Sequence, residues 1–292
     1  MSQDFSVLGE PGKPAERILS LAPSFTDTLL FLGLGQKIIG VTANCKPPKE
    51  LGKLPTCGSF ASPDIEKIAK LKPDLTLVLG RIHAPYLKEL LSYSKAVLTL
   101  DANTVAGIIN TMAEINRLAD GSNKGEDALT TLRQRYDAVV ERVKALNKPR
   151  VFRMMTEDPM VTATTASFQY NAIEVAGGQP MLLDYGEPYT AVTTEEIIDF
   201  DPEVIISCGR SYEQAVKKSC ENSHSDNPIC LRLPQDIIDN NHWKETSAAK
   251  TERAYTISCQ FICHPSPSLM DGIENMSALF HPEVATDDNI SK

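Results

Sequence analysis

Cysteine and histidine side chains come together near the end of this chain in a pattern that could hold a metal ion. Cys259 is followed four residues later by Cys263, and His264 stands next to it. Thiolate and imidazole are ligands for zinc, copper and iron. The spacing differs from the two-residue spacing of common zinc and iron-sulfur sites. We therefore predict Cys259, Cys263 and His264 as candidate metal ligands, and no more specific site than that.

A second group, Cys220-x3-His224-x5-Cys230, could bind a metal with help from Cys208. A disulfide or plain free thiols is the simpler interpretation of this group. The chain has seven cysteines, which are too few for a disulfide scaffold and leave at least one unpaired. The same choice between a local disulfide and buried thiols holds for the remaining two, Cys45 and Cys57.

An internal repeat places two arginines at equivalent positions. Residues 66–81 read EKIAKLKPDLTLVLGR and residues 195–210 read EEIIDFDPEVIISCGR, an alignment without gaps in which five positions are identical. In each copy a helix opened by Glu leads through a turn to a buried strand, and Gly-Arg follows the strand. Ligands collect beyond the carboxyl ends of strands in open α/β sheets. Arg81 and Arg210 are therefore candidates for pairing with a carboxylate or phosphate, against the plainer alternative of surface salt bridges.

The elements that must position these side chains alternate between apolar strands and short helices. Runs without polar alternation, typical of strands covered on both faces, predict a parallel sheet in the first part of the chain. Its predicted strands are 17–22, 37–41, 74–79 and 96–100. The first predicted helix begins with Ser24 or Thr26 as its N-cap and ends near Gly33 or Gly35. Two further predicted helices cover 65–71 and 84–92.

A long helix separates this series from a second one. Apolar residues keep helical spacing from about 126 to 147, and a strand over 150–155 opens another α/β series after Lys148-Pro149. The predicted fold is α/β, with two Rossmann-like lobes whose mainly parallel sheets are connected by a single long α-helix. The predicted boundaries are 15–102 for the first lobe, 103–148 for the helical connection and 149–286 for the second lobe.

Composition excludes several classes of protein. Hydrophobic residues make up 42% of the chain and charged residues 23%, and the formal net charge is −9. These values are typical of a globular protein and speak against binding to nucleic acid, which depends on clustered Lys and Arg. No segment approaches the ~20 apolar residues of a membrane-spanning helix. Met1 to Pro14 lacks the basic start and apolar stretch of a secretory signal, which leaves a cytoplasmic protein or one whose signal was removed.

Five segments in order resemble the substrate-binding proteins of ABC importers for cobalamin, haem and ferric siderophores. They are RILSLAPSFTDTLLFLGLGQKIIGVT (17–42), SPDIEKIAKLKPDLTLVLG (62–80), the helix of about 126–147, AIEVAGGQP with VTTEEIIDFDPEVII (172–206), and SPSLMDGIENMSALFHPE (266–283). The resemblance implies two lobes joined by one long helix, with a metal chelate such as a corrinoid, haem or ferric siderophore held between them. It also implies an extracytoplasmic monomer without an intrinsic cofactor that delivers its ligand to permease subunits. Residues 211–241 are longer than this family needs.

The same resemblance assigns candidate residues. Glu66 and Glu195 match the two glutamates with which such proteins dock onto their permease, although a Glu also favours a helix N-terminus by itself. His83, Tyr86 and His264 could coordinate the bound metal. Aromatic and cationic side chains in the loops that follow the strands would line the ligand. These candidates are Phe25, Phe60, Tyr189, Tyr212 and Phe261, together with Arg81 and Arg210.

Two other classes stay open. An enzyme is disfavoured, because the chain has no phosphate-binding Gly-x-x-x-x-Gly-Lys, no Gly-x-Gly-x-x-Gly after a strand and no Gly-x-Ser-x-Gly elbow. A cytoplasmic corrinoid or metal-cluster carrier with the same fold would suit the cysteines. Glu66 and Glu195 discriminate, since only an importer component needs them for delivery.

Overall fold

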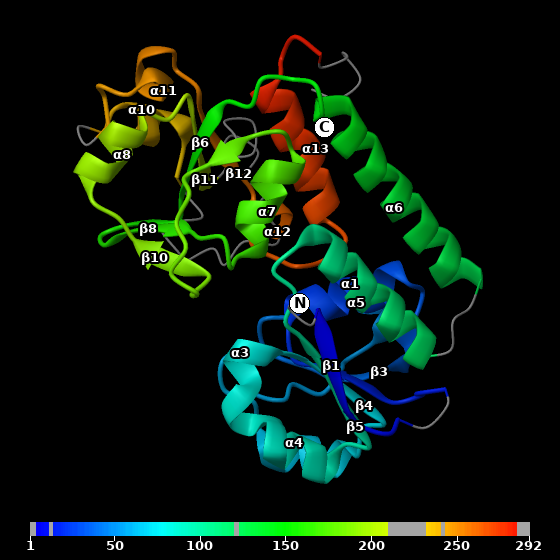
Figure 1. Ribbon diagram of the computed structural model, residues 1–292. Coiled ribbons are helices and arrows are strands. Elements are labelled where there is room, and N and C mark those ends of the chain that lie inside the picture. Colours follow the sequence, from blue (N-terminus) through cyan, green and yellow to red (C-terminus); the bar gives the residue numbers. More distant parts are fainter. Residues whose placement is uncertain (1–3, 12–13, 120–122, 210–231, 241–242, 285–292) are drawn as a thin grey trace. The chain divides into compact units, whose positions relative to one another are not determined.

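The computed structural model describes residues 4–11, 14–119, 123–209, 232–240 and 243–284. The chain divides into two compact units. Unit 1 comprises Met1–Ala102 with Ala106–Gln134, and unit 2 comprises Asn103–Val105 with Arg135–Lys292. Both are α/β, with mainly parallel sheets, as the sequence predicted (Figure 1).

Unit 1 is built on a five-stranded sheet in the order β1-β5-β4-β2-β3. Four neighbouring strands are parallel, and β1 pairs antiparallel with β5 at one edge. The sequence analysis predicted no strand in the region of β1. The strands are β1 (Phe5–Gly9), β2 (Ile18–Ser20), β3 (Ile38–Val41), β4 (Leu75–Leu79) and β5 (Ala96–Leu100).

Helices cover both faces of this sheet (Figure 1). They are α1 (Pro23–Phe31), α2 (Ile65–Leu71), α3 (Gly80–His83), α4 (Leu87–Tyr93) and α5 (Val105–Leu118), with short 3-10 turns at Gly35–Lys37, Lys49–Leu51 and Ala84–Tyr86. A core cluster under α2 and α4 contains Leu19, Ile68, Val78, Leu90 and Val97. Burying each such side chain stabilises the fold by about 1.5–3 kcal/mol.

The predicted start of α1 was wrong. Its N-cap is Ala22, which makes no side-chain hydrogen bond, and Pro23 stands at the first helical position. Proline tolerates this position because the N–H that it lacks has no partner inside the helix. Ser24 and Thr26 are both buried within the helix, where the Thr26 hydroxyl contacts the Ser20 hydroxyl at 2.8 Å.

Unit 2 contains a parallel sheet in the order β12-β11-β6-β9 and a small antiparallel sheet in the order β10-β8-β7. The strands are β6 (Arg150–Met154), β7 (Thr156–Glu157), β8 (Met160–Ala163), β9 (Gln179–Pro180), β10 (Tyr189–Ala191), β11 (Val204–Cys208) and β12 (Ala254–Ile257). The helices are α7 (Phe168–Val175), α8 (Thr194–Phe200), α10 (Pro234–Ile238), α11 (Ser247–Lys250), α12 (Cys259–Ile262) and α13 (Leu269–Phe280). Trp243 is fully buried in the core of this unit against Phe152.

The repeat seen in the sequence is a structural repeat. The order β5-β4-β2-β3 in unit 1 matches β12-β11-β6-β9 in unit 2. Helices α2 and α8 both begin after a residue whose side chain accepts a hydrogen bond from the third helical N–H, Asp64 in one copy and Thr193 in the other. Both end at a left-handed residue, Lys72 with φ 47° and Asp201 with φ 44°. The two copies of this helix, α2 and α8, therefore begin and end in the same way, in addition to packing in the same way.

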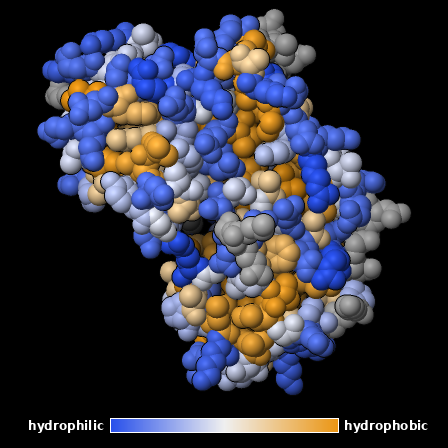
Figure 2. Space-filling view, in the orientation of Figure 1, coloured by the Kyte–Doolittle hydropathy of each residue, from blue (hydrophilic) through white to orange (hydrophobic). Residues whose placement is uncertain are grey.

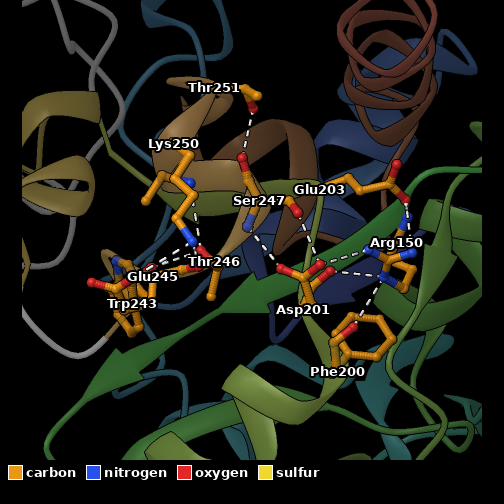
Figure 3. Close-up of polar contacts among 11 residues, drawn as sticks. Arg150, Phe200, Asp201, Glu203, Trp243, Glu245, Thr246, Ser247, Lys250 and Thr251 are labelled. Atoms are coloured by element: carbon orange, nitrogen blue, oxygen red, sulfur yellow. Dashed lines mark hydrogen bonds and ion pairs between the residues drawn. The ribbon is translucent and has the colours of Figure 1, made fainter.

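An arginine holds the carboxyl end of the repeated helix in each unit. Arg17 donates to the carbonyl oxygens of Leu71 and Lys72, and Arg150 donates to those of Phe200 and Asp201 (Figure 3). These carbonyls are left without partners inside the helix, so a cation that donates to them is favourable. The sequence contains both arginines at the start of a predicted strand, but their role becomes visible only in the structure.

Helix α6 (Asn123–Val143) is the long helix predicted from the apolar spacing. It begins three residues earlier than predicted and ends four residues before Asn147, since the chain turns after Val143. The division between the two units falls within it, between Gln134 and Arg135. In unit 2, Arg135 forms ion pairs with Asp271 and Glu274 of α13, which fixes the middle of α6 against that helix.

Hydrophilic side chains form much of the outline of each unit, with hydrophobic patches between them (Figure 2). Within the part of the chain that the structure describes, none of the helices has both the length and the hydrophobicity required to cross a bilayer.

Candidate functional site

The carboxyl ends of β6, β11 and β12 meet at one edge of the parallel sheet of unit 2. Strand β11 pairs with both neighbours, with Ser207 opposite Met154 on one side and Cys208 opposite Ile257 on the other. Helix α12 starts at Cys259, directly after β12. Because ligands bind beyond the carboxyl ends of parallel strands, this edge is the expected position of a functional site.

Three cysteines gather at this edge. The sulfur atoms of Cys208, Cys259 and Cys263 all lie within 4.8 Å of one another. Cys208 and Cys263 are in hydrogen-bond contact, with their sulfurs 3.0 Å apart. Cys259 and Cys263 are four residues apart on α12 and its C-cap, which places them on one face of that short helix. His264, predicted as a third ligand, is not a member of this group, and Cys208 stands in its place.

A buried arginine adjoins the thiols. Arg153 of β6 is 2% exposed, and its Nη2 donates to the sulfur of Cys208 at 2.9 Å and to that of Cys263 at 3.5 Å. Its Nη1 donates to the carbonyl oxygen of Met154 at 2.6 Å, and its Nε donates to Oε1 of Gln169 at 3.1 Å. A fully buried guanidinium is costly without hydrogen bonds and a counter-charge. The surrounding atoms supply four hydrogen bonds, and a thiolate is the available anion.

The electrostatics of the group favour a thiolate on Cys208. Hydrogen bonds from the thiols of Cys259 and Cys263 lower the pKa of the Cys208 thiol, and the charge of Arg153 acts in the same direction against burial. The same bonds to Cys208 raise the pKa values of Cys259 and Cys263. Burial opposes the charge on Arg153, but the adjoining sulfurs outweigh it and raise the pKa of the guanidinium.

The cluster of three cysteines is connected to Tyr189, a residue that the sequence analysis named as a candidate. Gln169 of α7 accepts from Arg153 and donates through Nε2 to the hydroxyl of Tyr189 at 3.3 Å. The residue Tyr189 is 37% exposed, whereas its hydroxyl lies in this buried network, and burial raises the pKa of that hydroxyl. Tyr189 of β10 thus links the surface of unit 2 to the buried arginine and cysteines.

At the corresponding edge of unit 1 the structure brings Phe60 and His83 together. Their rings meet edge to face with centroids 6.0 Å apart, and Nε2 of His83 lies 3.0 Å from the carbonyl oxygen of Phe60. The backbone N–H of Phe60 donates to Oδ1 of Asn44 at 2.8 Å. Phe60 is half-buried, and the loop that carries it is fixed from both sides.

His83 itself is fully buried. Its Nδ1 accepts from the backbone N–H of Leu79 at 3.1 Å, so the proton of the neutral ring is placed on Nε2, facing Phe60. Burial lowers the pKa of the imidazole. Both ring nitrogens are occupied within unit 1, which gives His83 a structural part in holding the Phe60 loop.

The remaining candidates fall into four groups. Phe25 is buried in α1 at 2% exposure, and Tyr86 packs against the core of unit 1. Arg81 is exposed on α3, while Phe261 and His264 are half-buried at α12. Arg210, Tyr212 and the group Cys220, His224 and Cys230 lie outside the described residues. Cys45 and Cys57 are buried free thiols.

Glu66 and Glu195 occupy the second position of α2 and α8 and are exposed. Neither is needed for capping. In α8 the capping box is closed by Glu196, whose carboxylate accepts from the backbone N–H of Thr193 at 2.8 Å. In α2 the cap is Asp64, which also pairs with Lys67. Within the described chain, the two glutamates have no hydrogen-bond or ion-pair partner.

Sequence reasoning missed Arg153, Gln169 and the part that Cys208 plays. The signal for Arg153 was present, because an arginine inside the apolar strand RVFRM must be buried with partners. Cys208 ends the equally apolar strand VIISC. The position of Cys259 beside Cys208 can be inferred only when β11 and β12 are known to be neighbours.

Comparison with known proteins agrees with this architecture. The sequence matches the periplasmic binding protein family over residues 18–260. A vitamin B12-binding protein of Vibrio parahaemolyticus is 24% identical over 271 residues, which cover 92% of this chain and 90% of that protein. An uncharacterized ABC transporter substrate-binding lipoprotein of Bacillus subtilis is 25% identical over 290 residues, covering 97% and 84%.

Among solved structures, a periplasmic haem-binding protein in complex with two haems has the same fold. It superposes with a TM-score of 0.72 at 18% identity, and the match covers 92% of this chain and 99% of that one. The family match extends over most of both units. The chain therefore belongs to the periplasmic binding protein family, a family of transport proteins that bind a substrate and are not enzymes.

Proposed function

We propose that the protein is the extracytoplasmic substrate-binding component of an ABC importer and that its substrate is a metal chelate of the corrinoid, haem or ferric siderophore type. Its relatives named above bind vitamin B12 or haem or belong to an ABC transporter. The bound chelate is the cargo, and Glu66 and Glu195 are the contacts to the permease subunits.

The pair of glutamates carries this proposal. Glu66 and Glu195 hold the same position in the two copies of the structural repeat, both are exposed, and the caps of their helices are made by other residues. A requirement of the fold would not explain both, because other residues cap both helices and an acid near a helix N-terminus contributes only about 0.3–1 kcal/mol. A permease with two matching basic pockets would explain both, since complementary charge guides and orients docking.

The ligand would be held by side chains at the carboxyl edges of the two sheets. Phe60 offers a half-buried ring on a fixed loop, which suits the face or edge of a macrocycle. Tyr189 and Phe261 offer rings in unit 2, and Arg81 offers a cation for a carboxylate or phosphate. Arg210 and Tyr212 complete the proposed set. The protein would act as a monomer, and no nucleic acid is among its proposed partners.

Charge reversal tests the docking step. The double variant Glu66→Lys/Glu195→Lys is expected to abolish chelate uptake by cells that contain the importer, and to leave the Kd of the purified protein for the chelate unchanged. Glu89→Lys/Asp137→Lys is the matched control, because it reverses one exposed acid in each unit on helices other than α2 and α8. Full uptake with the glutamate variant would contradict docking and favour a cytoplasmic carrier of corrinoids or metal clusters.

Binding itself is tested by titration with cobalamin, cobinamide, haemin and ferric siderophores. Trp243 is the single tryptophan and is buried, so its emission reports energy transfer to a bound chromophore rather than direct contact. One of these chelates should quench the emission saturably with a Kd below about 10 μM, which corresponds to roughly 7 kcal/mol. If none does so, the proposed substrate class is wrong.

A further inference from the structure

We propose that Cys208, Cys259 and Cys263 form a binding site for one thiophilic divalent cation, with Zn2+ as the reference ion. This site would be resident in unit 2 and separate from the transported chelate. It goes beyond the proposed function, and it holds or fails whichever chelate the protein carries.

The positions of the sulfur atoms suit a single ion. All three lie within 4.8 Å of one another. A zinc-sulfur bond of about 2.3 Å places the sulfurs of a three-thiolate site about 4 Å apart. An ion would replace the contact of 3.0 Å between Cys208 and Cys263 by a bond to each sulfur. The thiol protons would leave to solvent as the metal binds.

The charges balance for a divalent ion. Three thiolates and one divalent cation leave a net charge of −1, and the guanidinium of Arg153 beside Cys208 and Cys263 brings the sum to zero. Arg232 also interacts with Cys208, but its charge is paired with that of Glu157 and does not change this sum. Neutrality matters here because Cys208 and Arg153 are almost fully buried. A monovalent ion such as Cu(I) would leave an uncompensated negative charge. Hydrogen bonds from Arg153 to the sulfurs are the kind of outer contact that orients metal ligands.

The scaffold around the three thiols is fixed. Cys208 belongs to the central strand pair of the sheet, and α12 packs tightly against α13, where the carbonyl of Phe261 approaches Gly272 so closely that no side chain fits between them. Ser268 also donates to the carbonyl oxygen of Gln260 at 3.0 Å. Ligands carried by rigid elements lose little entropy when the metal binds.

The repeat shows that the fold does not require this arrangement. In unit 1 the position of Cys208 is taken by Leu79, and that of Arg153 by Ser20, as the matching strand registers show. The same chain therefore builds the same sheet with a leucine and a serine at these places. A buried arginine with three cysteines in unit 2 is better explained by a ligand than by packing.

The alternative is a disulfide between Cys208 and Cys263. It would leave Arg153 beside an uncharged bond and Cys259 as a third thiol without a function. Metal binding by the reduced protein distinguishes the two possibilities, because cysteines that serve only to form a disulfide are not expected to bind a metal ion when reduced.

The test uses the full chain, purified without oxygen, reduced and freed of metal, and titrated with Co2+ and then Zn2+. We expect one equivalent of Co2+ to give thiolate-to-cobalt charge-transfer absorption that one equivalent of Zn2+ removes. Cys208→Ser and Cys263→Ser should each weaken Zn2+ binding at least 100-fold. Cys45→Ser/Cys57→Ser and Cys220→Ser/Cys230→Ser are matched controls and should bind as the parent does.

A measurement on the unaltered chain tests the site even if the cysteine variants fail to fold. With Zn2+ present, Cys208, Cys259 and Cys263 should be protected from alkylation in mild denaturant, as mapped by mass spectrometry, whereas Cys45 and Cys57 should react equally with and without the ion. The absence of a stoichiometric cobalt spectrum in the reduced protein would overturn the site. Binding that survives in Cys208→Ser, or that disappears in Cys220→Ser/Cys230→Ser, would do so as well.

Discussion

Arg150 holds Asp201 at two atoms: its Nε donates to the carbonyl oxygen of Asp201 at 2.7 Å and its Nη2 to the carboxylate at 3.0 Å (Figure 3). The same carboxylate accepts from the backbone N–H and the hydroxyl of Ser247, at 2.7 and 2.8 Å. Asp201 is in the left-handed conformation, which is unfavourable for residues other than glycine. Its side chain compensates by joining the end of α8 to both β6 and α11.

Glycine at the two equivalent helix ends should have opposite effects on stability. Lys72→Gly relieves the left-handed backbone and removes no side-chain hydrogen bond or ion pair, so the free energy of unfolding should rise by about 0.5–1 kcal/mol. Asp201→Gly relieves the same backbone but loses the bonds to Arg150 and Ser247. It should lower the free energy of unfolding by about 1–2 kcal/mol. Chemical denaturation of both variants beside the parent measures the difference.

Asp201→Asn is a useful control, because it keeps the acceptor oxygen and removes the charge. It should lie between the parent and Asp201→Gly. If Asp201→Gly is as stable as Lys72→Gly, the contacts of the Asp201 carboxylate contribute nothing.

Local signals accounted for most of unit 1. Helix 65–71 and strand 96–100 were predicted with their observed bounds, since each is a short run with clear start and stop signals. The repeat extended this information to α8 and β11. Strand β1 was missed, because Phe5–Gly9 becomes a strand by pairing with β5 rather than through its own apolar pattern.

The candidate site was harder to predict because it depends on contacts between distant residues. Cys208 and Cys263 are 55 positions apart and meet only because β11 and β12 are parallel neighbours. The two-residue strand β7 and the three-residue strand β10 are too short to carry a periodic signal. By contrast, the equivalence of Glu66 and Glu195 could be read directly from the aligned repeat.

Acidification should destabilise the chain through His83. Burial lowers the pKa of this imidazole below its ordinary value of 6.5, so near and below pH 6.5 the unfolded chain binds more protons than the folded chain. The stabilising contribution is complete above pH 6.5 and is lost as pH falls through the folded pKa. Urea unfolding between pH 7.5 and about 5 should therefore show a steeper loss of stability in the parent than in His83→Gln.

The histidine ring itself provides the control for this effect. In NMR spectra the His83 signals should titrate at lower pH than those of His in the urea-unfolded chain. Equal titration midpoints, or identical pH slopes for the parent and His83→Gln, would contradict the assignment.

Phe60→Ala should weaken chelate binding about tenfold, which corresponds to about 1.4 kcal/mol. The reason is the loss of a half-buried ring on a loop that Asn44 and His83 hold in place. Tyr93→Ala is the matched control: this tyrosine is 46% exposed at the end of α4, before the amino end of β5, at the edge opposite the proposed ligand. Fluorescence titration with the chelate that binds the parent measures both. Equal losses in the two variants would show that Phe60 has no special place in binding.

Gly272→Ala should disturb the thiol-bearing helix α12 from the far side of its packing contact. A Cβ at this position would overlap the carbonyl oxygen of Phe261, a backbone atom that cannot rotate away, so α12 and α13 would have to separate. We expect a loss of about 2–3 kcal/mol in the free energy of unfolding. Gly52→Ala is the control for a destabilised chain, because Gly52 has φ 70° and ψ −164°, a conformation that alanine rarely adopts, but nothing within 4 Å of an added Cβ. It should cost about 1–3 kcal/mol through backbone strain alone. Because α12 carries Cys259 and Cys263, the displacement should also weaken Zn2+ binding in Gly272→Ala and leave it unchanged in Gly52→Ala. A Gly272→Ala protein that keeps both its stability and its metal affinity would show that α12 does not depend on this contact for its position.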